Sequence, residues 1–137
     1  MLDHFPNLYI GITGAWKLLS CLLTRHLNVT LVLGIGVITY STNLNTSEVI
    51  RRMAASNPET PLRILLETDA PFMTPSNIYS SLKDVKGRLP ISHSAMIPWT
   101  AEFVANVANE TATGGGNWDT LRVMREGREN AKKMYGV

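Results

Sequence analysis

The sequence predicts an α/β fold with parallel strands. Short apolar, β-branched runs occur at residues 8–13, 31–40 and 64–66, and such runs suit strands that are buried on both faces of a parallel sheet. An amphipathic helix predicted over residues 45–56 separates the last two runs. Strand, helix, strand in this order is the repeating unit of parallel α/β folds and (β/α) barrels.

The first predicted strand, Leu8–Thr13, is followed by a Leu-rich stretch at residues 15–36. This stretch is not a transmembrane helix, because polar residues leave no clean run of about 18–20 apolar residues. The interrupting residues are Lys17, Arg25, His26 and Asn28. Taken locally, residues 16–26 predict a short amphipathic helix and residues 31–40 a second strand.

The helix predicted over residues 45–56 has a start signal and an apolar face. Asn45 is the expected N-cap, and Glu48 three residues later would complete a capping box. The expected buried face consists of Val49, Ile50 and Met53, with Arg51 and Arg52 facing solvent. Pro58 and Pro61 end the helix before the next strand.

Two carboxylates directly follow the apolar run at 64–66. Because strand side chains alternate, Leu65, Glu67 and Asp69 share one face. Pro71 has no backbone donor and is expected to end the pairing. A carboxylate at the end of a buried strand is costly unless it is paired, protonated or bound to a metal. Ligands and metals bind at this end of parallel strands, so the pattern indicates a functional site.

The rest of the chain predicts a loop and two helices. A polar loop covers residues 76–90, and apolar residues at helical spacing predict a helix from Trp99 to Asn109. Gly114–Gly116 is interpreted as a flexible linker. Asn117 is the expected cap of a last helix that ends near Gly136. The predicted apolar face of that helix consists of Trp118, Leu121, Met124, Ala131, Met134 and Tyr135.

Composition and charge exclude several classes of protein. Of the 137 residues, 45% are hydrophobic and 18% charged, which argues against a disordered chain. A net charge of +2 does not by itself predict nucleic-acid binding. The concentrated basic stretch, residues 122–133, is diluted by Glu126 and Glu129 and is interpreted as a solvated helix face. A single cysteine, Cys21, predicts neither a disulfide framework nor a cysteine-based zinc site.

The N-terminus has no basic segment followed by an apolar core, so no signal peptide is predicted. We expect an intracellular protein, cytoplasmic or nuclear, that is not secreted and does not associate with a membrane. The sequence leaves the oligomeric state open.

Residues 65–71, LLETDAP, followed by Pro75, resemble the last-strand motif of the TatD family of metal-dependent deoxyribonucleases. Residues 92–109 and 129–136 resemble the segments that follow it in a eukaryotic branch of this family. The family fold is a TIM barrel of the amidohydrolase type. The resemblance implies that residues 1–137 form the C-terminal part of a (β/α)8 barrel, which would be incomplete.

The resemblance also implies a site. It makes Asp69 a metal ligand and catalytic residue for divalent ions, of the Mg or Zn type, with DNA as the substrate. Glu67 would support the site structurally, and Arg88 and His93 are candidates for contacting a substrate phosphate. The family's remaining ligands, a His-x-His pair, a Glu and two further His, cannot be placed in this chain. We therefore expect the polypeptide to be inactive by itself.

Two alternatives stay open. Family members run directly from a segment like residues 9–14 to one like residues 37–43, so residues 15–36 are interpreted as a translated intron or gene-model error, with a genuine inserted helix as the rival explanation. For function, the alternative to a truncated nuclease is a non-catalytic module that associates through exposed strand edges.

Overall fold

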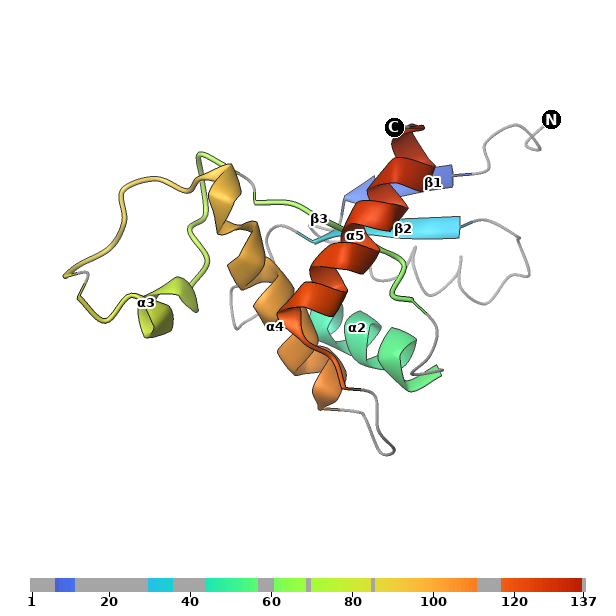
Figure 1. The fold of residues 1–137 in the computed structure, drawn as a ribbon, viewed down its shortest axis with the longest axis horizontal. Helices are drawn as coiled ribbons and strands as arrows, with labels where there is room; N and C mark the ends of the chain where they lie inside the picture. Colours follow the sequence, from blue (N-terminus) through green and yellow to red (C-terminus); the bar gives the residue numbers. More distant parts are fainter. Residues whose placement is uncertain are drawn as a thin grey trace.

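The structure, a computed structural model, describes residues 7–11, 30–35, 44–56, 61–68, 70–84, 86–110 and 117–136 (Figure 1). The elements in these ranges are, in chain order, β1 (Asn7–Gly11), β2 (Thr30–Ile35), α2 (Leu44–Ser56), β3 (Ile64–Leu66), α3 (Ile78–Ser81), the 3₁₀ helix η1 (Ser94–Met96), α4 (Ile97–Asn109) and α5 (Thr120–Tyr135). The predicted helix at 16–26, the strand segment at 37–40 and the glycine linker at 114–116 lie outside the described residues, as does Asp69.

The described strands form one parallel sheet in the order β1-β2-β3. Asn7 of β1 pairs with Thr30 of β2, and Leu33 of β2 pairs with Ile64 of β3. β2, the central strand, lies within residues 15–36, so this stretch contributes backbone pairing to both neighbours. Because the strands are parallel, their carboxyl ends lie at the same edge of the sheet. The barrel that the resemblance implies needs further strands and stays a prediction.

Helix α2 confirms the predicted buried face. Val49 and Ile50 are buried, and Met53 packs against the core as a half-buried side chain. Helix α2 begins at Leu44, one residue before the predicted N-cap Asn45, and the capping box stays a prediction. Glu48 pairs with basic residues one turn further along the helix, accepting a hydrogen bond from Arg52 Nε at 2.8 Å.

Helix α4 is the centre of the helical layer. It packs against both α2 and α5 and also contacts β3, as its position beside α5 in Figure 1 indicates. Ile97, Ala101, Val104, Ala105 and Ala108 recur at helical spacing as predicted, and all of them except the half-buried Ile97 are buried. Ile64 of β3 is fully buried in the same core. The start of β3 is therefore packed in the core, and the candidate site follows at the other end of the strand.

Helix α5 differs from its prediction in two respects and agrees with it in a third. Its N-cap is Asp119, whose side chain accepts a hydrogen bond from the Arg122 backbone N–H at 2.6 Å, so Asn117 is not the cap. Leu121 and Tyr135 are 77% and 64% exposed, although periodicity placed them on the apolar face. The predicted end is confirmed, because Gly136 adopts the left-handed conformation that terminates helices.

Candidate functional site

The candidate site lies where β3 ends. β3 ends at Leu66, one residue before the first of the two carboxylates predicted to form the site. Glu67 is half-buried and Thr68 is buried. Asp69, the predicted metal ligand, lies outside the described residues, and the chain continues at the exposed Ala70. The two residues that flank Asp69 thus lie at the carboxyl edge of the parallel sheet.

The loop that leaves β3 returns to it at Ser92. The Ser92 backbone N–H donates to the Pro71 carbonyl oxygen at 2.8 Å, and its hydroxyl lies 3.5 Å from the Thr68 carbonyl oxygen. Ser92 is buried, with 3% of its surface exposed. Both bonds flank the position of Asp69, so Ser92 ties the far end of the loop to the end of the strand. Sequence reasoning did not identify Ser92, because a lone serine in a polar loop carries no signal.

His93 follows Ser92 and is the N-cap of η1. Its Nδ1 accepts a hydrogen bond from the Ala95 backbone N–H at 3.0 Å. An imidazole nitrogen that accepts a hydrogen bond carries no proton, so the neutral ring carries its proton on Nε2. The side chain is exposed. His93 can therefore donate through Nε2 to an anion while its other nitrogen holds the turn.

Arg88 lies in the middle of the same loop. It is exposed, and it follows Gly87, which adopts a φ of 88° that a residue with a side chain rarely adopts. The next residue, Leu89, donates its backbone N–H to the Tyr79 hydroxyl at 3.0 Å. Tyr79 therefore fixes the backbone beside Arg88. Within the described part of the chain, no hydrogen bond or ion pair joins Arg88 to His93 or to Glu67.

Asn77 fastens the start of this loop to α4. Its side-chain nitrogen donates to the Trp99 carbonyl oxygen and to a Glu102 carboxylate oxygen, both at 2.8 Å. Trp99 in turn donates its indole N–H to the Ser81 hydroxyl at 3.1 Å. Residues 77–81, which include the short helix α3, are thus held to α4, while the middle of the loop extends away from the helices (Figure 1).

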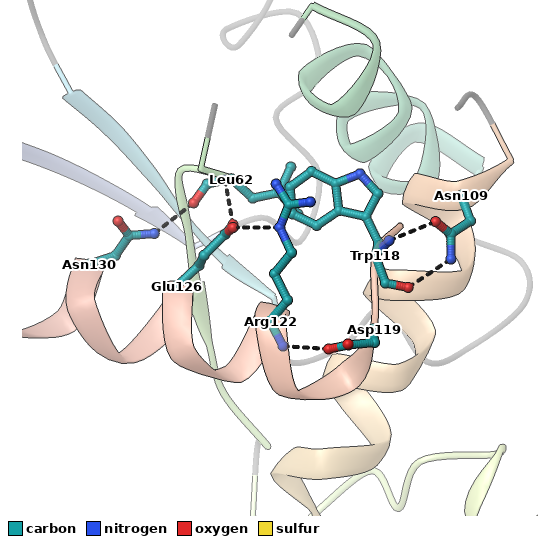
Figure 2. A network of polar contacts seen from close by, with 7 residues as sticks. All are labelled: Leu62, Asn109, Trp118, Asp119, Arg122, Glu126 and Asn130. Carbon is teal, nitrogen blue, oxygen red and sulfur yellow. Dashed lines mark hydrogen bonds and ion pairs between the residues drawn. The ribbon is translucent and has the colours of Figure 1, made fainter. Parts of the chain in front are cut away.

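Helix α5 holds the start of β3 through side chains that bond its backbone (Figure 2). Asn130 donates from Nδ2 to the carbonyl oxygens of Leu62 and Ile64, at 2.7 and 2.9 Å. Glu126 accepts the Leu62 backbone N–H at 2.8 Å. These groups would otherwise remain available for pairing with another strand, so α5 occupies the place of a neighbouring strand here.

A second set of contacts fixes the N-terminal end of α5. The Arg122 Nε donates to Glu126 at 2.9 Å, and its guanidinium carbon lies 3.5 Å from the centroid of the Trp118 ring. Asn109 of α4 bonds both the N–H and the carbonyl oxygen of Trp118, at 3.0 and 2.8 Å (Figure 2). Arg122 and Glu126 are 21% and 12% exposed. The prediction of a solvated face over residues 122–133 is therefore wrong for these two residues.

That error has a physical cause. Charge pattern alone cannot distinguish an acid facing water from one that accepts a buried backbone N–H. The only sequence signal was an Asn and a Glu four residues apart, which places Glu126 and Asn130 on one side of the helix.

Glu67 lines a hollow between β3 and α5, together with Arg125 and Arg128. This location suits the predicted structural role of Glu67, a role that stays a prediction. Among the described residues, no group of three His, Cys, Asp or Glu side chains is arranged to hold a metal ion. None of the helices in the described ranges has the length and apolar character needed to cross a membrane.

Comparisons with known proteins identify no relative. No protein-family model matches the chain, and the curated proteins and the solved structures likewise give no match. The assignment of function therefore depends on the chain's own residues and on the motif resemblance.

Proposed function

We propose that this chain contributes the last ligand-bearing strand of a TatD-type metal-dependent deoxyribonuclease, with Asp69 as a ligand of a divalent cation. One observation carries the proposal: LLETDAP, residues 65–71, spans the carboxyl end of β3 in a parallel sheet. That end of a parallel strand is where α/β proteins bind ligands and metals. A carboxylate there has an energetic reason to take a cation.

The chemistry of such a site assigns distinct roles to the residues. A bound divalent cation makes its water a nucleophile at neutral pH and offsets the charge of the phosphodiester. Asp69 would ligate it and orient, or take a proton from, the attacking water. A catalytic metal site needs about three protein ligands, and this proposal assigns Asp69 alone from this chain. The polypeptide is therefore inactive until other ligands complete the site.

The loop supplies candidate contacts to the phosphate. Arg88 carries a permanent positive charge, and its guanidinium can donate two hydrogen bonds to one phosphate group. His93 offers Nε2–H, since its Nδ1 already accepts from Ala95. Ser92 links the loop to Thr68 and Pro71, which keeps His93 close to the strand end.

A two-part experiment tests the proposal. The coding sequence upstream of Met1 is determined, and we expect an open reading frame with a His-x-His motif and further ligands. The 137-residue protein and the extended protein are then assayed for DNA hydrolysis with Mg²⁺, Mn²⁺ and Zn²⁺. We expect activity in the extended protein alone, and we expect Asp69→Asn to abolish it. Cleavage that persists in Asp69→Asn would contradict the assignment.

The second candidate function is association with another chain through a strand edge. The hydrogen bonds of β3 limit which edge of the described sheet can be used. The β3 edge at Leu62 and Ile64 is already bonded by α5, whereas β1 is the other outer strand of the described sheet. Association of this kind would therefore use β1. Light scattering after size-exclusion chromatography would support it if a Pro substitution at Tyr9 converts an oligomer into a monomer.

A further inference from the structure

The hollow between β3 and α5 has the features of a small-molecule site. Its volume is about 510 Å³, within the range of about 300–1,000 Å³ that is usual for ligand pockets. Apolar side chains form most of its lining, among them Leu66 of β3, Ile97 of α4, and Met124 and Ala131 of α5. Elements separated by more than 50 residues in the sequence therefore line one space.

Gly127 explains how the two elements approach each other. It is buried on the face of α5 that meets β3, and a Cβ atom there would lie 3.3 Å from the Leu66 side chain. A Cβ at this position would require the Leu66 side chain to shift by a few tenths of an ångström. The glycine thus brings the helix close to β3 at this point, and the hollow opens beside it.

The polar part of the lining is mainly basic. Arg125 and Arg128 lie three residues apart, which places them side by side on the helix, and both are exposed. Neither forms an ion pair with another residue in the described ranges. Glu67 lines the opposite wall, so these charged residues together carry a net charge of +1. Neighbouring guanidinium groups repel each other, and an anion placed between them would remove that repulsion.

We infer that the hollow between β3 and α5 binds a small organic anion, with an aromatic or branched apolar body and a carboxylate head. The apolar lining takes the body, and Arg125 and Arg128 take the head, since guanidinium groups bind carboxylates in a paired geometry. The inference uses neither Asp69 nor the nuclease assignment, so it can fail or succeed independently of the proposed function.

The test uses sodium 2-naphthoate as the probe and amide NMR shifts of the full 137-residue chain as the readout. We expect saturable shifts at Leu66, Ile97, Gly127 and Ala131. Arg125→Gln and Arg128→Gln should each weaken binding by about tenfold, the usual effect of losing one charge-assisted hydrogen bond. Lys133→Gln removes a positive charge from an exposed position on the same helix outside the hollow, and it should change binding by less than about twofold.

Two further arms separate the apolar and ionic contributions. The neutral analogue 2-naphthalenemethanol should bind about tenfold more weakly than 2-naphthoate, because it lacks the carboxylate. Ala131→Phe fills the hollow and should abolish binding. The two Arg→Gln changes lie at exposed positions and leave the fold intact. Binding to these two variants therefore decides the test if the Ala131→Phe protein does not fold. The inference is overturned if no saturable binding occurs or if the Arg→Gln variants bind like the wild type. Shifts that follow self-association of the chain, and not the probe, would overturn it as well.

Discussion

Two regions that adjoin β3 are built in opposite ways. Before the strand, Asn130 and Glu126 of α5 bond the backbone of Leu62 and Ile64. After the strand, the loop exposes Arg88 and His93. The first region contributes mainly to stability, whereas the second leaves side chains accessible to a substrate. Substitutions in the two regions should therefore have separable effects.

The largest expected difference compares two tryptophans. Trp118 is 2% exposed and supports the α5 junction, whereas Trp99 is half-buried and fastens the loop through Ser81. Trp118→Ala should lower the free energy of unfolding by about 3–5 kcal/mol, as buried Trp truncations do. Trp99→Ala should cost less and should raise hydrogen exchange mainly in residues 77–89. Denaturant unfolding measures the loss of stability in each variant, and hydrogen exchange measures the local effect. An equal loss of unfolding free energy in the two variants would contradict the distinction between the two regions.

The next effect isolates the bonds from α5 to the strand. Asn130→Ala removes the hydrogen bonds to the Leu62 and Ile64 carbonyl oxygens and should lower stability by about 1–3 kcal/mol. Asn106→Ala is the matched control, since it makes the same exchange at an exposed position in α4. It should have no destabilising effect, because Ala is the better helix former. If thermal unfolding gives both variants the same stability, the two Asn130 hydrogen bonds, of which Figure 2 draws the one to Leu62, contribute nothing measurable.

Substitutions of the loop residues should affect stability less than the two preceding changes. Arg88→Ala is expected to change the free energy of unfolding by less than about 0.5 kcal/mol, as exposed substitutions do. His93→Ala should cost up to about 1 kcal/mol, since it removes the cap of η1. In the extended protein, both substitutions should raise the KM for DNA, although they leave the free energy of unfolding almost unchanged. A loss of several kcal/mol in either variant would place these residues in the fold and not in the site.

The smallest effect concerns the exposed end of α5. The Lys132 ammonium bonds Glu129 and lowers the pKa of that carboxyl group below its ordinary value. A lowered folded-state pKa contributes stability above the unfolded-state pKa, and this contribution is lost as the pH falls through the folded-state value. NMR titration of Lys132→Gln should show the Glu129 pKa raised toward its ordinary value. An unchanged pKa would show that the pair does not form in solution.

The sequence predicted much of the helical part of this fold. Periodicity located the buried faces of α2 and α4, because burial of apolar side chains is a local pattern that repeats along a helix. It failed for Leu121, which lies two residues before the buried Val123 and therefore faces the other side of α5. It also failed for Tyr135, the last residue of the helix. The bonds from Asn130 and Glu126 were missed because they join residues more than 60 positions apart.

The strands and the site were predicted less completely. The segment 31–40 was expected to contain a strand, and β2 forms over Thr30–Ile35, but no local pattern indicated that it would pair between β1 and β3. Whether residues 15–36 are native is a question for the transcript. A mature message that retains this stretch, with detectable protein, would exclude the intron interpretation.

The central claim is that the polypeptide directly after β3 offers a carboxylate to a divalent cation. Substoichiometric Mn²⁺ broadens amide NMR signals near its binding site, even when binding is weak. We predict selective broadening at Thr68 and Ala70 that is lost in Asp69→Asn and retained in Glu102→Gln, a matched acid substitution on α4. Broadening that survives in Asp69→Asn, or that spreads evenly over the protein, would contradict the account.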